Sequence, residues 1–306
     1  MRGKEKLCRG KKGMPKVIGL IGYPARKNLS AFMHNAGFKK LNMNYIYLLF
    51  EVKPINLKEA VQGMKVLNFA GFNVTIPFKE EIVPLLDEIT VEANEIGAVN
   101  TVWRDKKGRL VGGNTDGKGF LQALKIEKGI NPLGKKIFLL GSGGAARAIT
   151  ITLVKEKISE LYLIDLDKNK AESLAIRADE ISKKIGHTLL KLEVVEASDY
   201  QKMKKIVNKI DILVNATPVG MYSNPNNIPI PIEVLNPHIL VYDIINNPYK
   251  TKFLQLAEQL GAETLNGLPM LAYQGVEAFR RWTGKDVSVE LFKKIAREYV
   301  EKYSFI

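Results

Sequence analysis

Short apolar runs alternate with longer amphipathic segments along the first third of this chain. Residues 17–22, 45–52 and 71–77 have the composition of strands, whereas residues 31–42 and 55–67 repeat apolar side chains at helical spacing. The remaining predicted elements of this third are short helices at 80–89 and 90–98 and a strand at 100–105. Such alternation predicts an α/β fold with a largely parallel sheet.

A second alternating unit follows residues 131–136 (NPLGKK), where Asn-Pro and glycine favour a turn. Its predicted strands lie at 137–140, 161–165, 189–195, 211–217 and 239–245, with amphipathic helices between them. From residue 266 onward the pattern is helical and amphipathic, and we expect this segment to pack against the first unit.

Composition is that of a globular protein. The 306 residues are enough for two domains, and 46% are hydrophobic. No apolar run reaches the roughly 18–20 residues of a membrane span, and the basic N-terminus lacks the apolar core of a secretory signal. The only cysteine, Cys8, excludes a disulfide framework and a cysteine-based metal site, and we expect a reduced, cytoplasmic setting.

The formal net charge of +14 raises the question of nucleic-acid binding. Basic residues are spread along the chain with acids between them, and no nucleic-acid module is recognisable. A lysine-rich solvated surface is the favoured interpretation; a field that attracts small anions and a nucleic-acid surface are the alternatives. We expect neither nucleic acid nor membrane as a partner.

A glycine-rich loop follows the strand at 137–140. Residues 141–146 (GSGGAA) match the dinucleotide fingerprint, with Gly141, Gly143 and Ala146 in the three small positions. The glycines permit a tight turn and a close approach of pyrophosphate, and the following helix offers free N–H groups. We predict cofactor contacts from Gly141, Ser142, Gly143, Gly144 and Ala145. The alternative is a glycine-rich turn that binds no nucleotide.

Two aspartates, Asp165 and Asp167, end the next strand about 20 residues further on. A carboxylate there accepts hydrogen bonds from the ribose 2′-OH and repels a 2′-phosphate. The loop holds no arginine, although Lys168 and Lys170 can offset part of the repulsion. The pattern therefore predicts NAD rather than NADP, with both aspartates as cofactor contacts; alternatively they only cap the next helix.

Lys79 lies just past a predicted strand, in the stretch GFNVTIPFK. Pro77 interrupts strand pairing, and ligands bind beyond the carboxyl ends of strands in open α/β sheets. A partly desolvated lysine beside a carboxylate can protonate a ketone that receives hydride. Asp116, in a glycine-flanked turn of GGNTDGKGF, is the candidate carboxylate. Composition alone would instead make Lys79 an ordinary surface lysine.

These stretches together resemble the shikimate/quinate dehydrogenase family from residue 17 to about 300. The resemblance implies that Lys79 is the catalytic lysine and Asp116 its partner. It further implies substrate contacts from Thr75, from Asn100 in IGAVNT and from Gln274 in NGLPMLAYQGVEAF. Cofactor contacts are implied for Thr217 and Pro218 in NATPVGM and for Gly267 in the C-terminal block.

The chain departs from the family pattern at one end of the substrate. Where the family has G-x-P-x-x-H-S-x-S-P-x-x-H-N, this chain has GYPARKNLSAFMHN, so that Lys27 replaces a histidine and Asn28 a serine. Ser30 is kept, and it is expected to hold the substrate carboxylate with Asn28. Asn246, in DIINNP, replaces a tyrosine of the same region, and the resemblance implies that it contacts the substrate there. These changes predict an altered carboxylate pocket or a different ring substrate.

The resemblance thus implies a two-domain oxidoreductase that reversibly reduces 3-dehydroshikimate to shikimate, or 3-dehydroquinate to quinate, with NAD(P). We predict a substrate domain from residues 16–116 and 268–306, a Rossmann domain from 117–267 and a disordered tail over 1–15. The alternative is a relative that binds NAD or a cyclic hydroxy acid without turnover, although retention of Lys79 and Asp116 argues against it. We expect a monomer or homodimer.

Other candidate residues favour structural roles. His34, His187 and His238 lack metal-ligand spacing, so that no metal site is expected. His34 is predicted to pack on a helix, and the other two histidines to lie in loops or on the surface. Trp282 and Tyr273 are predicted core residues.

Overall fold

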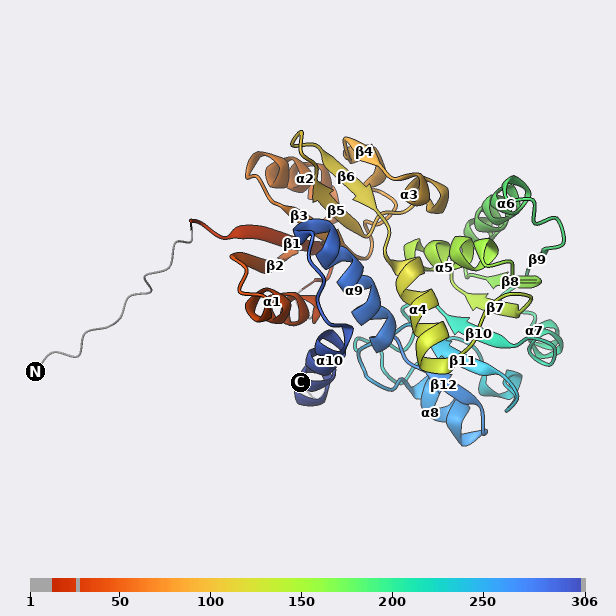
Figure 1. Ribbon diagram of the computed structural model, residues 1–306. Coiled ribbons are helices and arrows are strands. Elements are labelled where there is room, and N and C mark those ends of the chain that lie inside the picture. The colour runs from red at the N-terminus through yellow and green to blue at the C-terminus, as the bar shows by residue number, and fades with distance from the viewer. Residues whose placement is uncertain (1–12, 26–27, 304–306) are drawn as a thin grey trace, which may run out of the picture.

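The computed structural model describes residues 13–25 and 28–303, and it confirms an α/β architecture with two six-stranded sheets among those residues (Figure 1). The first sheet has the order β2-β1-β3-β5-β6-β4. Its strands are β1 (Lys16–Gly22), β2 (Tyr45–Glu51), β3 (Gly71–Val74), β4 (Glu88–Ile89), β5 (Thr101–Arg104) and β6 (Leu110–Gly113). Strand β5 is antiparallel to both of its neighbours, so this sheet is mixed rather than largely parallel.

The second sheet is parallel throughout and has the order β12-β11-β10-β7-β8-β9. Its strands are β7 (Lys136–Leu140), β8 (Glu160–Ile164), β9 (Lys191–Val194), β10 (Ile212–Asn215), β11 (Leu240–Asp243) and β12 (Glu263–Leu265). This is the strand order of a Rossmann fold, in which the chain reverses direction across the sheet between β7 and β10. Ligands in such sheets bind at that point.

Ten α-helices cover the sheets within the described residues. They are α1 (Ser30–Lys40), α2 (Leu57–Val66), α3 (Val91–Ile96), α4 (Asp116–Lys128), α5 (Gly144–Lys155), α6 (Lys168–Lys184), α7 (Tyr200–Val207), α8 (Lys252–Gln259), α9 (Leu268–Thr283) and α10 (Val289–Tyr303). None of the described helices is both long and apolar enough to span a membrane.

The C-terminal helices return to the first sheet, as predicted. Phe279 of α9 and Phe292 of α10 are fully buried against α1, in one apolar cluster with Met33 and Phe38. Trp282 joins this core and donates its indole N–H to the main-chain oxygen of Val102 at 2.9 Å. Helix α9 therefore fixes the C-terminal segment to the sheet whose strand β3 leads into the turn with Lys79.

Helices α4 and α9 lie side by side between the two sheets (Figure 1). A Cβ on Gly119 of α4 would lie 2.7 Å from the Cβ of Gln274 in α9, so the helices approach closely only because residue 119 is glycine. Asp116 was expected in a turn; it is instead the first residue of α4. Gly117 and Gly119 of GGNTDGKGF therefore serve helix packing, since a Cβ on Gly117 would lie 2.0 Å from Thr152 Oγ1 of α5.

A second contact joins the halves at helix α3. Two arginines of the second half hold its C-terminal carbonyls: Arg147 Nε donates to Ile96 O at 3.1 Å, and Arg177 Nε to Glu95 O at 2.6 Å. Ile96 and Ala98 pack in an apolar cluster with Ala148 of α5. The first half is therefore anchored to α5, the helix that follows the glycine loop.

The helix expected at residues 80–89 is absent. Residues Val83–Leu85 form one 3₁₀ turn, and Glu88–Ile89 pair with β6 as strand β4. Pro84 lacks the N–H that a longer helix would use, and Asp87 exchanges hydrogen bonds with Leu110. The basic tail falls largely on residues 1–12, outside the described residues, and the predicted domain boundaries stay predictions.

Candidate active site

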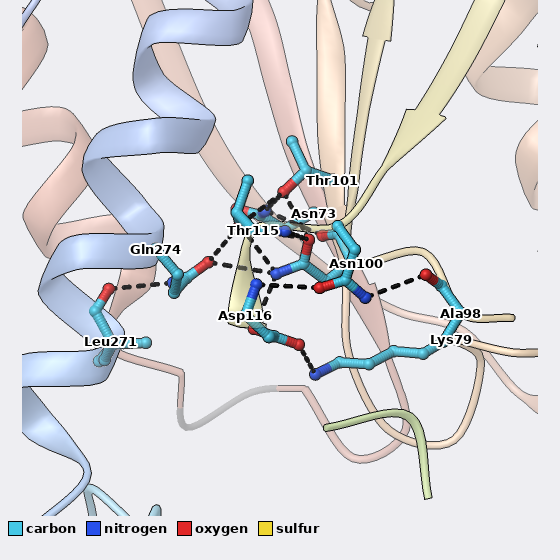
Figure 2. Close-up of polar contacts among 10 residues, drawn as sticks. Asn73, Lys79, Ala98, Asn100, Thr101, Thr115, Asp116, Leu271 and Gln274 are labelled. Atoms are coloured by element: carbon cyan, nitrogen blue, oxygen red, sulfur yellow. Dashed lines mark hydrogen bonds and ion pairs between the residues drawn. The ribbon is translucent and has the colours of Figure 1, made fainter. Parts of the chain in front are cut away.

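Lys79 and Asp116 meet at the centre of the candidate site (Figure 2). Lys79 Nζ lies 2.6 Å from Asp116 Oδ2, and the two side chains are 15% and 9% exposed. Lys79 follows β3 in a turn that the fully buried Phe78 anchors, and its main-chain oxygen accepts from the N–H of Val99 at 2.7 Å. The contact expected between these two side chains is present, and its acid–base role stays a prediction.

Asn100 holds the other oxygen of the same carboxylate. Its Nδ2 donates to Asp116 Oδ1 at 2.8 Å and to Thr115 Oγ1 at 2.9 Å, while its Oδ1 accepts from the N–H of Thr115 at 2.8 Å. Both carboxylate oxygens of Asp116 are therefore engaged, one by an ammonium group and one by an amide. Hydrogen bonds to a carboxylate stabilise its charged form.

Gln274 reaches this cluster from α9 (Figure 2). Its Nε2 donates to Leu271 O at 3.0 Å, and its Oε1 accepts from Thr115 Oγ1 at 3.2 Å. Thr75 is half-buried one turn before Lys79, where its methyl group packs so closely on Gly22 that a Cβ there would lie 2.3 Å away. The fold thus gathers Lys79, Asn100, Asp116 and Gln274, with Thr75 on the same loop as Lys79.

The residues predicted at the carboxylate end lie in two segments. Ser30 is buried at the start of α1, and its N–H donates to Asn28 Oδ1 at 2.9 Å, which turns the acceptor end of Asn28 toward the helix. Lys27 lies outside the described residues. Asn246 is half-buried in the segment between β11 and α8. The role of these residues at a carboxylate stays a prediction.

The glycine loop has the form that a dinucleotide needs. Gly141 adopts a φ of +103°, which favours glycine, and its N–H donates to Ile164 O at 2.7 Å. Gly143 is exposed at the start of α5, where no side chain of the described residues caps the helix and, apart from its chain neighbours, none of their atoms lies within 4 Å of an added Cβ. A Cβ on Gly144 would lie 2.7 Å from the Cβ of Lys79, so the loop directly adjoins the lysine.

The remaining predicted cofactor contacts lie around two buried polar residues that the sequence analysis missed. Asn215 Oδ1 accepts from the N–H and hydroxyl of Thr217, the neighbour of the exposed Pro218, and Asn215 Nδ2 donates to Asp243 at 3.1 Å. Burial raises the pKa of Asp243 to about 6, against hydrogen bonds from Thr251 and Asn215 that lower it. Asn215 ends β10 and Asp243 ends the neighbouring strand β11. Because ligands bind at such strand ends, this position could have identified both residues from the sequence.

Gly267 lies against the same region. A Cβ there would fall 1.9 Å from the main-chain oxygen of Ile244, and the glycine N–H donates to Ile245 O at 3.0 Å. Only glycine permits this approach, which brings the start of α9 to the end of β11. Its contact with a cofactor stays a prediction.

Comparison with known proteins identifies the family of this chain. The family model described as the shikimate dehydrogenase substrate binding domain matches residues 20–102, and that of the shikimate 5′-dehydrogenase C-terminal domain matches residues 267–297. A shikimate dehydrogenase (NADP+) of Desulforamulus reducens is 42% identical over 95% of this chain and 97% of its own length. The chain belongs to the shikimate dehydrogenase family.

Solved structures of this family share its fold. A shikimate dehydrogenase in complex with NADP+ has a TM-score of 0.83 at 40% identity and covers 94% of this chain and 96% of its own. The shikimate 5-dehydrogenase of Listeria monocytogenes, in complex with shikimate and NAD, has a TM-score of 0.82 at 37% identity and covers 95% and 99%. The resemblance seen in the sequence is therefore confirmed.

The prediction of NAD is wrong. Family members from Desulforamulus reducens, Alkaliphilus metalliredigens and Methanopyrus kandleri, 41–43% identical, are all named as NADP(+) enzymes. That prediction assumed that both aspartates are free to accept hydrogen bonds from the ribose hydroxyls. Instead, Asp165 Oδ2 accepts from Ser142 Oγ at 2.6 Å, and Asp167 caps α6 by accepting from the N–H of Asn169 at 3.1 Å. The capping alternative holds for Asp167.

Proposed function

We propose that this chain catalyses the reversible, NADP-dependent reduction of 3-dehydroshikimate to shikimate. One observation carries the proposal: the partly buried Lys79–Asp116 pair adjoins Gly144 at the start of α5. A proton donor and the phosphate-binding end of a helix therefore lie within one site, as hydride transfer to a ketone requires. The named activity of the 42% identical family member agrees with this chemistry.

Lys79 acts as the general acid in reduction. It donates a proton from Nζ to the carbonyl oxygen as hydride reaches the carbon, and in the oxidation direction it accepts the hydroxyl proton. Asp116 holds Nζ at 2.6 Å and is itself fixed by Asn100 at 2.8 Å. The nicotinamide of a bound cofactor supplies or receives the hydride.

The other polar side chains orient the ring. Asn100 and Gln274 lie within one hydrogen-bonded cluster, and Thr75 shares the loop of Lys79, so these three are proposed to contact ring hydroxyls. Ser30 and Asn28 are proposed to hold the carboxylate. Because Asn28 Oδ1 accepts from Ser30 N, its amide N–H₂ group is the end that faces a carboxylate.

Initial rates test the proposal. Shikimate and quinate are each assayed with NADP and with NAD at equal concentrations, and we expect the highest kcat/KM for shikimate with NADP. Dominance of quinate would contradict the proposed substrate and would point to the replacements at Asn28 and Asn246 as the cause. Binding of NADP without turnover of either acid would instead support a non-catalytic relative.

A further inference from the structure

A line of buried hydrogen bonds extends from Asp116 into the core of the first sheet. Three of its members, Tyr47 of β2, Asn73 of β3 and Thr101 of β5, take no part in the proposed chemistry, and each is at most 6% exposed. Figure 2 shows Asn73 and Thr101 beside Asn100, which donates to Asp116. Buried polar side chains are costly unless they are paired, so this cluster calls for a physical explanation.

The hydrogen bonds fix the orientation of the Asn73 amide. The phenol of Tyr47 donates to Asn73 Oδ1 at 2.8 Å, so Asn73 Nδ2 is the end that faces β5. This Nδ2 donates to the main-chain oxygen of Asn100 at 3.0 Å and to Thr101 Oγ1 at 3.0 Å. Because Thr101 Oγ1 accepts from Asn73, its own proton points to a different partner.

That partner is the side chain of Asn100. Thr101 Oγ1 donates to Asn100 Oδ1 at 3.0 Å; the hydroxyl of Thr115, at 3.3 Å, is the more distant alternative. The N–H of Thr115 also donates to Asn100 Oδ1. With Oδ1 held by these donors, Asn100 Nδ2 turns to Asp116 Oδ1 and leaves Oδ2 for Lys79.

We infer that Asn73 and Thr101 are positioning residues for the acid–base pair, because their hydrogen bonds orient the Asn100 amide that holds Asp116. The inference rests on the proposed function and adds two residues to it. Both act through Asn100 rather than on the substrate. The competing explanation is a cross-strand contact that only stabilises the pairing of β3 with β5.

Two substitutions at Thr101 separate these explanations. Thr101→Val keeps the shape but removes the hydroxyl, and we expect kcat with shikimate and NADP to fall about threefold to tenfold, the effect of one hydrogen bond, while KM for NADP stays unchanged. Thr101→Ser keeps the hydroxyl and restores kcat. A purely structural role would lower the free energy of unfolding of Thr101→Val and leave its kcat unchanged.

A matched control exists in α5. Thr150 is fully buried, and its hydroxyl has no hydrogen-bond partner among the described residues. Thr150→Val therefore deletes a buried threonine hydroxyl outside the hydrogen-bonded line, and we expect it to leave kcat unchanged. Equal losses of kcat in the valine and serine variants of Thr101 would overturn the inference, because shape would then matter and the hydroxyl would not.

The failures of the two proposals are distinguishable. A wild-type protein that does not turn over shikimate with NADP overturns the proposed function, and the inference falls with it. An active wild type with an unchanged Thr101→Val overturns the inference alone. Should Thr101→Val fail to fold, Tyr47→Phe removes the hydroxyl that donates to Asn73 and also hydrogen-bonds Ser30. A twofold to fivefold lower kcat with an unchanged KM for shikimate, about the effect of one weakened hydrogen bond, supports the inference, and an unchanged kcat overturns it.

Discussion

At the scale of the residue, the surroundings of Nζ distinguish Lys79 from the other lysines. Its side chain is 15% exposed beside Asp116, whereas Lys183, paired with Asp179, is 70% exposed. Exposed ion pairs contribute little to stability, whereas the two charges of a partly desolvated pair interact strongly.

The proximity of Lys79 to a carboxylate could be predicted from the sequence motifs around the two residues. Asn73 and Thr101 could not, because their partners come from strands that only the folded sheet brings together.

His34 gives a pH-dependent prediction at the same scale. It is fully buried among Tyr47, Trp282 and Phe292, with no hydrogen-bond partner for either ring nitrogen among the described residues. Burial lowers its pKa from 6.5 to about 3. Between those values the unfolded chain binds the additional proton, so the stability contributed by neutral His34 is lost as pH falls below 6.5.

The substitution His34→Leu removes this dependence. Urea unfolding at pH 7 and pH 5 should show that the free energy of unfolding of the wild type falls by about 2 kcal/mol more than that of the variant, at roughly 1.4 kcal/mol per pH unit below 6.5. The altered packing in the variant changes its stability equally at both pH values, so it does not affect this comparison. Parallel pH dependences in the two proteins would contradict the assignment.

At the scale of the element, patterns with many apolar repeats predicted the structure well. The helical pattern at residues 55–67 corresponds to α2 within a few residues at its ends, and the helical pattern from residue 266 onward corresponds to α9 and α10. Strand β6 (Leu110–Gly113) and helix α4 were missed, because glycines at 112, 113, 117 and 119 read as turn residues. The folded protein uses such glycines for close packing, which depends on a neighbour far away in the sequence.

Gly119→Ala tests that explanation. The added Cβ would lie 2.8 Å from the main-chain nitrogen of Gln274 and 2.8 Å from Met270 O, so we expect a loss of about 1–3 kcal/mol in the free energy of unfolding. Gly63→Ala, in α2, is the matched control. Beyond the backbone of its own helix and its chain neighbours, no atom in the described part of the chain lies within 4 Å of an added Cβ, and alanine should stabilise by about 0.5–1 kcal/mol. Chemical denaturation measures both; similar effects would contradict the packing argument.

At the scale of the whole molecule, the site depends on how the two halves meet. Figure 1 shows α4 and α9 between the sheets, and α3 lies against α5. These contacts bring Lys79 of the first half to Gly144 of the second. The Rossmann half could be predicted from its parallel-strand pattern and glycine loop. The contacts of the two aspartates after β8 could not, because the sequence does not show that Asp165 accepts from Ser142 or that Asp167 caps α6.

Arg147 tests the contact between the halves. Its side chain is 14% exposed, burial lowers the pKa of its guanidinium, and Nε donates to Ile96 O. Arg147→Met leaves that carbonyl without this donor, and we expect a loss of about 1–3 kcal/mol in the free energy of unfolding. Arg109→Met, which removes an exposed guanidinium from Asp105 and Glu88, should change stability little. Equal effects in thermal or urea unfolding would contradict a stabilising contact at α3.

The most direct test of the central claim is the turnover of Lys79→Ala. With shikimate and NADP, kcat should fall at least about 100-fold, because general acid–base catalysis is lost, while NADP still binds the glycine loop. Lys40→Ala, at an exposed lysine of α1, serves as the control and should keep wild-type kcat. Near-normal turnover by Lys79→Ala would contradict the proposed mechanism, because it would show that another group carries the proton.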